Sequence, residues 1–169
     1  FESQWVIGGE GLNDGEEACL NLIRGDKGAI GLGGHDETGR HGSAIQPGGL
    51  DLTKCLELVE AGERLDGLSS QPLPLDNLDF IRRCQAEVLF ENTPVEHASG
   101  QPAVDHIRLA LESGMHVATA NKGPIVHAYR ELSDLARARG RRFQFESTVM
   151  DGAPIFSLFR ETLPGAQLK

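Results

Sequence analysis

A glycine-rich turn near the N-terminus is the first place where residue types and spacing indicate chemistry. Gly9 and Gly11 lie between a short apolar segment at residues 4–8 and an amphipathic segment at residues 16–24. A tight turn from a strand into a helix lets the backbone approach a pyrophosphate, whose charge then faces the amides of the helix N-terminus. This turn therefore predicts a dinucleotide site. The residues expected to bind there are Gly9, Gly11, Leu12 and Asn13.

The same turn departs from the usual spacing of three glycines. The third glycine position holds Asp14, and Gly15 follows one residue later. A carboxylate beside a phosphate is unfavourable because like charges repel. Two interpretations remain open: a loop one residue longer than usual that still binds pyrophosphate, or a glycine-rich turn without a ligand.

Asp36 follows the second expected strand at about the distance where dinucleotide folds place a carboxylate. Such a carboxylate accepts hydrogen bonds from the ribose hydroxyls and repels a 2′-phosphate, so Asp36 favours NAD. Arg40 and His41 could instead bind a 2′-phosphate, which keeps NADP open. A solvated loop aspartate is the alternative interpretation of Asp36.

Two later strand ends also carry polar residues. Thr93 follows the apolar segment 87–90, and Asn121 and Lys122 follow the segment 116–119. Open parallel sheets bind ligands at the carboxyl ends of their strands, where a lysine could stabilise negative charge on a substrate or take part in proton transfer. A strand-end cap and a surface lysine are the alternatives. The cofactor-binding residues expected here are Asn92, Thr93, Pro94, Asn121 and Lys122.

The elements that must position these residues alternate between short apolar runs and amphipathic segments. Strands are expected at residues 4–8, 29–32, 87–90, 116–119 and 142–149. Helices are expected at residues 16–24, 52–61, 76–85, 102–113, 125–139 and 154–162, with loops at 35–49 and 69–74. This alternation predicts an α/β fold, a doubly wound parallel sheet with helices on both faces.

Composition excludes several classes of function. The 169 residues carry a net charge of -9, which argues against nonspecific binding of nucleic acid. Cys19, Cys55 and Cys84 show no CxxC spacing and are expected to be reduced thiols of a cytoplasmic protein rather than zinc ligands. No segment has the length of a membrane span or the pattern of a signal peptide, so no membrane partner is expected.

Four segments carry a family resemblance when they are taken in order. They are FENTP at residues 90–94, GQPA at 100–103, HVATANKGP at 116–124 and FESTVMDGAPI at 145–155. This series resembles homoserine dehydrogenases, which interconvert homoserine and aspartate semialdehyde with NAD(P). The resemblance is strong from about residue 87 and looser before it.

The resemblance implies a Rossmann-like NAD(P)-binding domain over residues 1–150 and the start of a substrate and dimerisation domain at 151–169. Lys122 matches the family's active-site lysine, beside cofactor and substrate. The family's acid/base lysine and acidic residues would lie beyond residue 169, so this chain is expected to bind a cofactor but to be poorly active alone. The full protein is expected to be a homodimer that acts on a small amino acid in threonine and methionine biosynthesis.

The resemblance also implies a monovalent cation, typically sodium, bound by backbone carbonyls in the turn that precedes the last helix. The matching positions are Glu146, Val149, Asp151 and Ala153. Met150 and Asp151 stand where relatives often have small residues, and Asp151 as the cap of the last helix is an equal alternative. Two rival functions also remain: another dehydrogenase on the same fold, and a ligand-sensing or regulatory domain without catalysis.

Overall fold

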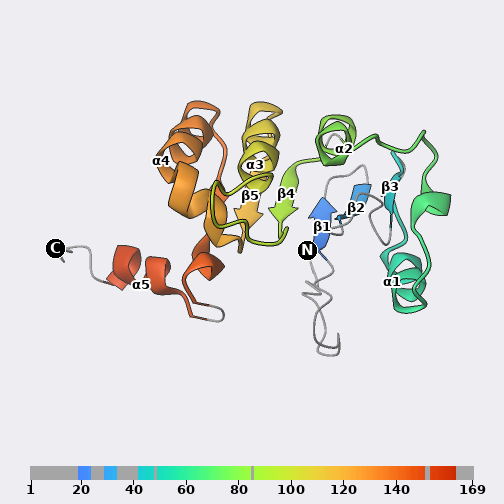
Figure 1. Ribbon diagram of the computed structural model, residues 1–169, viewed down its shortest axis with the longest axis horizontal. Coiled ribbons are helices and arrows are strands. Elements are labelled where there is room, and N and C mark those ends of the chain that lie inside the picture. Colours follow the sequence, from blue (N-terminus) through green and yellow to red (C-terminus); the bar gives the residue numbers. More distant parts are fainter. Residues whose placement is uncertain are drawn as a thin grey trace.

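The computed structural model describes residues 19–23, 29–33, 42–47, 49–84, 86–150 and 153–162 (Figure 1). The strand expected at residues 4–8 lies outside these ranges. Among the described residues, no helix is long and apolar enough to cross a membrane.

A three-stranded parallel sheet occupies the second half of the chain. Its strands are β4 (Val88–Glu91), β5 (His116–Thr119) and β6 (Phe143–Gln144), in the order β4-β5-β6. The connections run through α3 (Ala103–Glu112) and α4 (Lys122–Ala138). The predicted strand and helix alternation is therefore confirmed from residue 88 onward, with parallel strands joined by helical crossovers.

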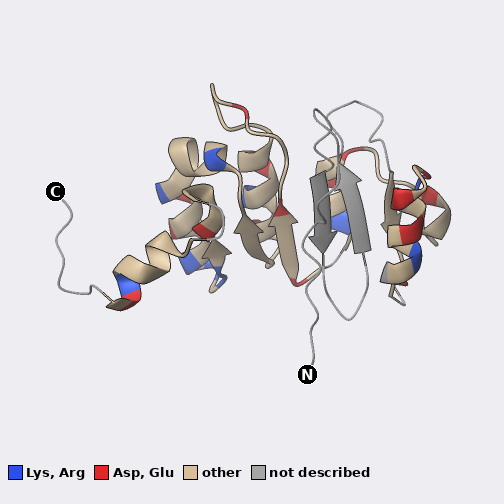
Figure 2. Ribbon diagram, turned by 90° about the horizontal axis from the view of Figure 1, so that it is seen from below, with Lys and Arg blue, Asp and Glu red and all other residues tan. Residues whose placement is uncertain are grey.

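Three helices cover one face of this sheet. α2 (Asn77–Cys84), α3 and α4 lie side by side above β4 and β5 in Figure 1, and Figure 2, seen from below, shows the strands in front of them. The main core is shared by these layers: Ile107, Leu111 and Leu132 pack with Leu89 of β4 and Val117 of β5. Burial of their apolar side chains stabilises the parallel sheet.

Glycines end the two long helices of this half. Gly114 after α3 and Gly140 after α4 both have positive φ angles, 86° and 62°. A residue in this left-handed conformation stops a helix, and glycine adopts it without a steric penalty. The chain then turns directly into β5 or β6.

A second, antiparallel sheet precedes the parallel one and corrects part of the sequence prediction. β1 (Cys19–Ile23) pairs with β2 (Ala29–Gly33), which pairs with β3 (Ser43–Ile45). The helix predicted at residues 16–24 is wrong, and the loop predicted at 35–49 contains β3. The sequence CLNLI is apolar except for Asn21, and so short an apolar run does not separate a helix from a strand.

The first helix packs against this antiparallel sheet. α1 (Leu52–Glu60) contributes Cys55 to a small core with Ala44 of β3 and Leu65. Asp51 caps this helix, since its Oδ1 accepts hydrogen bonds from the backbone amides of Thr53 and Lys54 at 3.0 and 3.2 Å. The two sheets meet where β1 lies beside β4 (Figure 1).

The last described elements are short. β6 is followed by a 3-10 turn at η2 (Glu146–Thr148) and then by α5 (Ile155–Thr162). The strand predicted over residues 142–149 is therefore only two residues long, although the helix predicted at 154–162 is confirmed within one residue.

Candidate cofactor site at the carboxyl ends of β4 and β5

The carboxyl ends of β4 and β5 meet at one edge of the parallel sheet. Glu91 and Thr119, the last residues of the two strands, are partners in the register. Two residues further along each strand end, Asn121 Nδ2 donates a hydrogen bond of 2.9 Å to the Thr93 carbonyl oxygen. Residues that are 28 positions apart in the sequence are therefore joined at this edge.

Glu91 lies at the centre of this edge and is almost completely buried, with 1% of its surface exposed. One carboxylate oxygen accepts hydrogen bonds from the Thr93 hydroxyl and, at 2.9 Å, from the Thr93 backbone amide. The other accepts the Thr119 hydroxyl at 3.0 Å. These bonds supply the partners that a buried carboxyl group requires.

Thr119 extends this set of bonds to Asn121. The Thr119 hydroxyl donates to Glu91 and accepts the Asn121 backbone amide at 3.0 Å. Asn121 Nδ2 donates to the Thr93 carbonyl oxygen, and Thr93 donates to Glu91, so the hydrogen bonds form a closed ring. We call Glu91, Thr93, Thr119 and Asn121 the strand-end network.

Burial raises the pKa of the Glu91 carboxyl group, because removal from water disfavours the charged form. The hydrogen bonds from Thr93, Thr119 and Asn121 act in the opposite direction and stabilise the carboxylate. The carboxyl group therefore keeps a raised pKa in an environment that contains four donors but is closed to water.

Asn121 also begins the helix that follows β5. Its backbone is extended, and its side-chain Oδ1 accepts the Gly123 amide at 2.9 Å, which makes it the N-cap of α4. Lys122 is the first residue of α4 and is exposed. The lysine is thus carried on backbone that the strand-end network fixes, while its side chain faces solvent.

The loop between β4 and α3 packs closely on the start of α4. Gly100 has a φ angle of 73°, and a Cβ atom there would lie 2.8 Å from the Gly123 carbonyl carbon. Within the loop, Glu96 accepts the amides of Ala98 and Ser99 at 2.7 and 2.8 Å. The Ser99 hydroxyl, followed by these two amides, lowers the pKa of Glu96 to about 2.

A family model described as homoserine dehydrogenase, NAD binding domain, matches residues 28–146. This chain belongs to the homoserine dehydrogenase family. The homoserine dehydrogenase of Methanocaldococcus jannaschii is 35% identical over 131 residues, which are 78% of this chain and 39% of the relative. The NAD(+)-dependent homoserine dehydrogenase of Pseudomonas canavaninivorans is 34% identical over 127 residues, 75% of this chain and 36% of the relative.

Solved structures of homoserine dehydrogenases agree with this family. A hyperthermophilic archaeal enzyme in complex with NADPH has a TM-score of 0.59 and 31% identity, over 76% of this chain and 38% of the other. The enzyme from Thermoplasma acidophilum gives 0.58 and 26%, over 75% and 38%. The predicted Rossmann-like α/β fold and the predicted family are confirmed. The chain spans less than two fifths of the length of these relatives.

The structure joins the two strand ends that the homoserine dehydrogenase resemblance singled out. Thr93 and Asn121 are in direct hydrogen-bond contact, Pro94 contributes a carbonyl oxygen 3.4 Å from Asn121 Nδ2, and Asn92 lies in the same loop. The Thr93 hydroxyl donates to Glu91, the last residue of β4. Thr93 therefore also caps the strand end, which was the alternative interpretation of this residue. The other predicted cofactor residues lie outside the described ranges: Gly9, Gly11, Leu12, Asn13, Asp36 and Arg40.

The turn predicted to bind a cation is partly described. Both carboxylate oxygens of Glu146 are engaged by Ser157 of α5, one with its amide at 3.0 Å and one with its hydroxyl at 2.9 Å. The Ser157 amide is the main reason that the pKa of Glu146 is lowered. Asp151 lies outside the described residues. Among the described residues, no three His, Cys, Asp or Glu side chains gather as metal ligands would.

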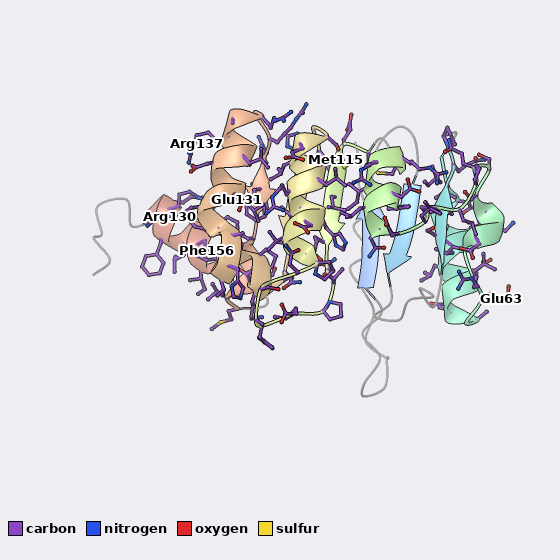
Figure 3. The ribbon with its side chains drawn as sticks, turned by 45° about the horizontal axis from the view of Figure 1, so that its top comes forward. Glu63, Met115, Arg130, Glu131, Arg137 and Phe156 are labelled. Atoms are coloured by element: carbon purple, nitrogen blue, oxygen red, sulfur yellow. The ribbon has the colours of Figure 1, made fainter. Side chains whose placement is uncertain are left out.

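Aromatic rings attach α5 to the rest of the domain. Phe145 contacts Tyr129 of α4 and Phe156 of α5, with ring centroids 5.4 and 5.1 Å apart and nearly perpendicular planes. Figure 3 labels Phe156 where α5 meets α4. No described residue of α5 is buried, and its aromatic contact comes from Phe156 in the first turn.

Glu91 and Thr119 are the site residues that sequence reasoning missed. The signal was available, because side chains alternate between the faces of a strand. Leu89 and Glu91 are both buried in β4, as Val117 and Thr119 are in β5. A glutamate on the buried face of a short strand has to find hydrogen-bond partners, and its neighbours at the strand end are the nearest ones.

Proposed function

We propose that this chain is the NAD(P)-binding part of an oxidoreductase that interconverts L-homoserine and L-aspartate 4-semialdehyde. Residues 1–150 form its cofactor-binding domain and residues 151–169 begin its substrate domain. The observation that carries this proposal is the junction of Thr93 and Asn121 at the carboxyl edge of β4 and β5, within residues matched by a homoserine dehydrogenase NAD-binding model. Ligands of open parallel sheets bind at this edge.

The proposed cofactor site combines two parts of the chain. The glycine turn and the residues after the second strand bind the pyrophosphate and ribose: Gly9, Gly11, Leu12, Asn13, Asp36 and Arg40. The strand ends receive the nicotinamide half: Asn92, Thr93, Pro94, Asn121 and Lys122. The relatives include an enzyme named NAD(+)-dependent and one solved with NADPH, so both cofactors are candidates.

Bound NAD(P) supplies the hydride acceptor or donor, and the residues of this chain supply position and charge. Asn121 fixes the backbone from which Lys122 projects. The Lys122 ammonium group can then stabilise negative charge on the substrate carboxylate or on the oxygen that becomes an alkoxide. Proton transfer from that oxygen would use the acid/base lysine that we place in the substrate domain.

Cofactor titration tests this proposal directly. NADH and NADPH fluorescence titrations of the chain should give saturable binding of at least one cofactor, and homoserine oxidation by the chain alone should be weak. In a protein that also contains the substrate domain, Lys122→Ala should lower kcat/KM by about 10²–10³-fold, the usual effect of removing one charge-stabilising donor. Lys54→Ala is the matched control, because Lys54 is exposed on α1, a helix that packs near the antiparallel sheet and not at the carboxyl ends of β4 and β5.

Three results would contradict the proposal. Absence of binding for both cofactors would remove the assigned site. Equal activity of the Lys122 and Lys54 variants would remove the role of Lys122. Rapid turnover by the chain alone would show that no acid/base group beyond residue 169 is required.

We also propose that backbone carbonyls at Glu146, Val149, Asp151 and Ala153 bind a monovalent cation such as sodium. Carbonyl oxygens suit hard cations, and a carbonyl has two lone pairs. The Ala153 carbonyl accepts the Ile155 amide at 2.9 Å and so keeps one lone pair for an ion. Thermal unfolding in sodium chloride should then occur at a higher temperature than in choline chloride at equal ionic strength. Identical unfolding temperatures would exclude the site.

The full protein is further proposed to be a cytoplasmic homodimer of threonine and methionine biosynthesis that acts on a small amino acid. The support is the family itself, since homoserine is a small amino acid. Sedimentation of the full-length protein should give twice the mass of one chain, and a monomer would contradict this proposal.

A further inference from the structure

The strand-end network contains a buried glutamate, Glu91, at a position where an apolar residue would serve the packing of the sheet. An apolar side chain at position 91 would fill the space without the cost of removing a carboxylate from water. Instead Glu91 is 1% exposed and accepts hydrogen bonds from two threonines, Thr93 in the loop after β4 and Thr119 at the end of β5. A buried group of this kind fixes the groups that donate to it.

The bonds lead from Glu91 to the start of α4 in three steps. The Glu91 carboxylate accepts the Thr119 hydroxyl at 3.0 Å, and that hydroxyl accepts the Asn121 amide at 3.0 Å. The Asn121 side chain then accepts the Gly123 amide at 2.9 Å. The backbone of residues 119–123 is therefore aligned by a group that is itself closed to solvent.

A parallel branch fixes the other strand end. The backbone amide and the hydroxyl of Thr93 both donate to one Glu91 oxygen, and the Thr93 carbonyl accepts Asn121 Nδ2. Thr93 and Asn121 are thus held in one relative position by a single carboxyl group.

We propose that Glu91 is a positioning residue for the dinucleotide, which acts through Thr93 and Thr119 to hold both strand ends in the geometry that receives the nicotinamide half. The inference rests on the proposed function, because it assigns the cofactor to this edge. Glu91 itself does not touch the cofactor. Its role is to prevent the two strand ends from moving apart.

Substitution of Thr119 tests the inference without placing a new group at the surface. Thr119→Val keeps the shape of the side chain but removes the hydroxyl that joins Glu91 to Asn121. Thr119→Ser keeps that hydroxyl. Fluorescence titration with NADH and NADPH, well below the unfolding temperature, should show about tenfold weaker binding for Thr119→Val, the scale of one hydrogen bond to a charged group. Thr119→Ser should bind within about twofold of the parent chain.

Two further variants separate positioning from general stability. Leu89→Ala removes a fully buried side chain of the same strand face and makes no bond to the network, so it should lower the unfolding temperature but leave the Kd within about twofold. Glu91→Gln keeps the size of the side chain but replaces one of its two acceptor oxygens by an amide donor, and should weaken binding about as much as Thr119→Val.

The outcomes distinguish the two levels of the proposal. If the parent chain binds neither cofactor, the proposed function fails and the inference fails with it. If the parent binds and Thr119→Val binds equally well, only the inference is overturned. The inference is also overturned if Leu89→Ala weakens binding as strongly as Thr119→Val, because the effect would then follow stability alone.

Discussion

Gly100 should be far less tolerant of alanine than other glycines of the same backbone conformation. Gly100 has a φ angle of 73°, and Gly62, in the turn after α1, has a φ angle of 71°. A Cβ atom at Gly100 would lie 2.8 Å from both the carbon and the oxygen of the Gly123 carbonyl. At Gly62 it would meet no atom within 4 Å. Alanine therefore costs the same backbone free energy at both sites, but only at Gly100 does it add a steric clash.

The structure sets the expected size of each effect. A left-handed backbone costs an L-residue about 1–2 kcal/mol, which is the whole penalty expected for Gly62→Ala. Gly100→Ala carries the same penalty and must also push the loop and the start of α4 apart, as overpacked cores do at about 1–3 kcal/mol. Its total is about 2–5 kcal/mol. In a domain of this size each kcal/mol lowers the Tm by about 2–4 °C.

Urea unfolding of the parent and the two variants measures this difference. Both variants should shift the midpoint to lower urea with an unchanged m-value, and the shift for Gly100→Ala should be at least about 1.5 times that for Gly62→Ala. Equal shifts would refute the reasoning, because they would show that the loop and α4 do not press against each other at Gly100. Gly100→Ala should also weaken cofactor binding, since Gly123 is bonded to Asn121.

Three further predictions concern titratable groups. Burial lowers the pKa of His106 from its ordinary 6.5, so the stability that its neutral form contributes is lost as pH falls below 6.5, and His106→Leu should flatten thermal stability between pH 7 and pH 5. The pKa of Glu96 is about 2, so its stabilising effect is present above 4.5 and lost toward pH 2; Glu96→Gln should be less stable than the parent at pH 7 and equal to it near pH 2. Ser157→Ala removes a donor to Glu146 and should raise the pKa of that carboxyl group in an NMR titration, whereas Ser147→Ala should not.

The sequence predicted the fold best where a helix or strand had local signals at both ends. Residues 116–119 were predicted as a strand and are β5, and a glycine ends each of the two helices beside it. The helix predicted at 52–61 begins after Asp51, whose side chain caps α1. In these cases the periodicity and the end signals agree, so the interpretation does not depend on distant contacts.

The predictions for the segments that form β1 and β3 were wrong for the opposite reason. The five residues of β1 fit both a helix and a strand, and the choice is made by pairing with β2, which local patterns do not contain. β3 is only three residues long, and it too depends on pairing with β2. Such short strands become strands because a neighbour supplies hydrogen bonds.

Only part of the candidate site could be predicted from the sequence. Thr93 and Asn121 follow strands whose ends were predicted, and the rule that parallel strands end at the same edge was enough to bring them together. Glu91 and Thr119 were missed because the rule for open sheets indicates the residues that follow a strand and not the last residue within it. Their importance comes from a register that pairs them across 28 positions, which only the structure reveals.

The attachment of α5 has a mechanical consequence. Its first turn is fixed by Phe156 against Phe145 and by Ser157 against Glu146, while its last turn has no buried residue. A helix of eight residues is about 12 Å long, so a tilt of about 10° about its first turn displaces its last residue by about 2 Å. A small reorientation of residues 145–146 is therefore expected to move Thr162 further than it moves the first turn of α5.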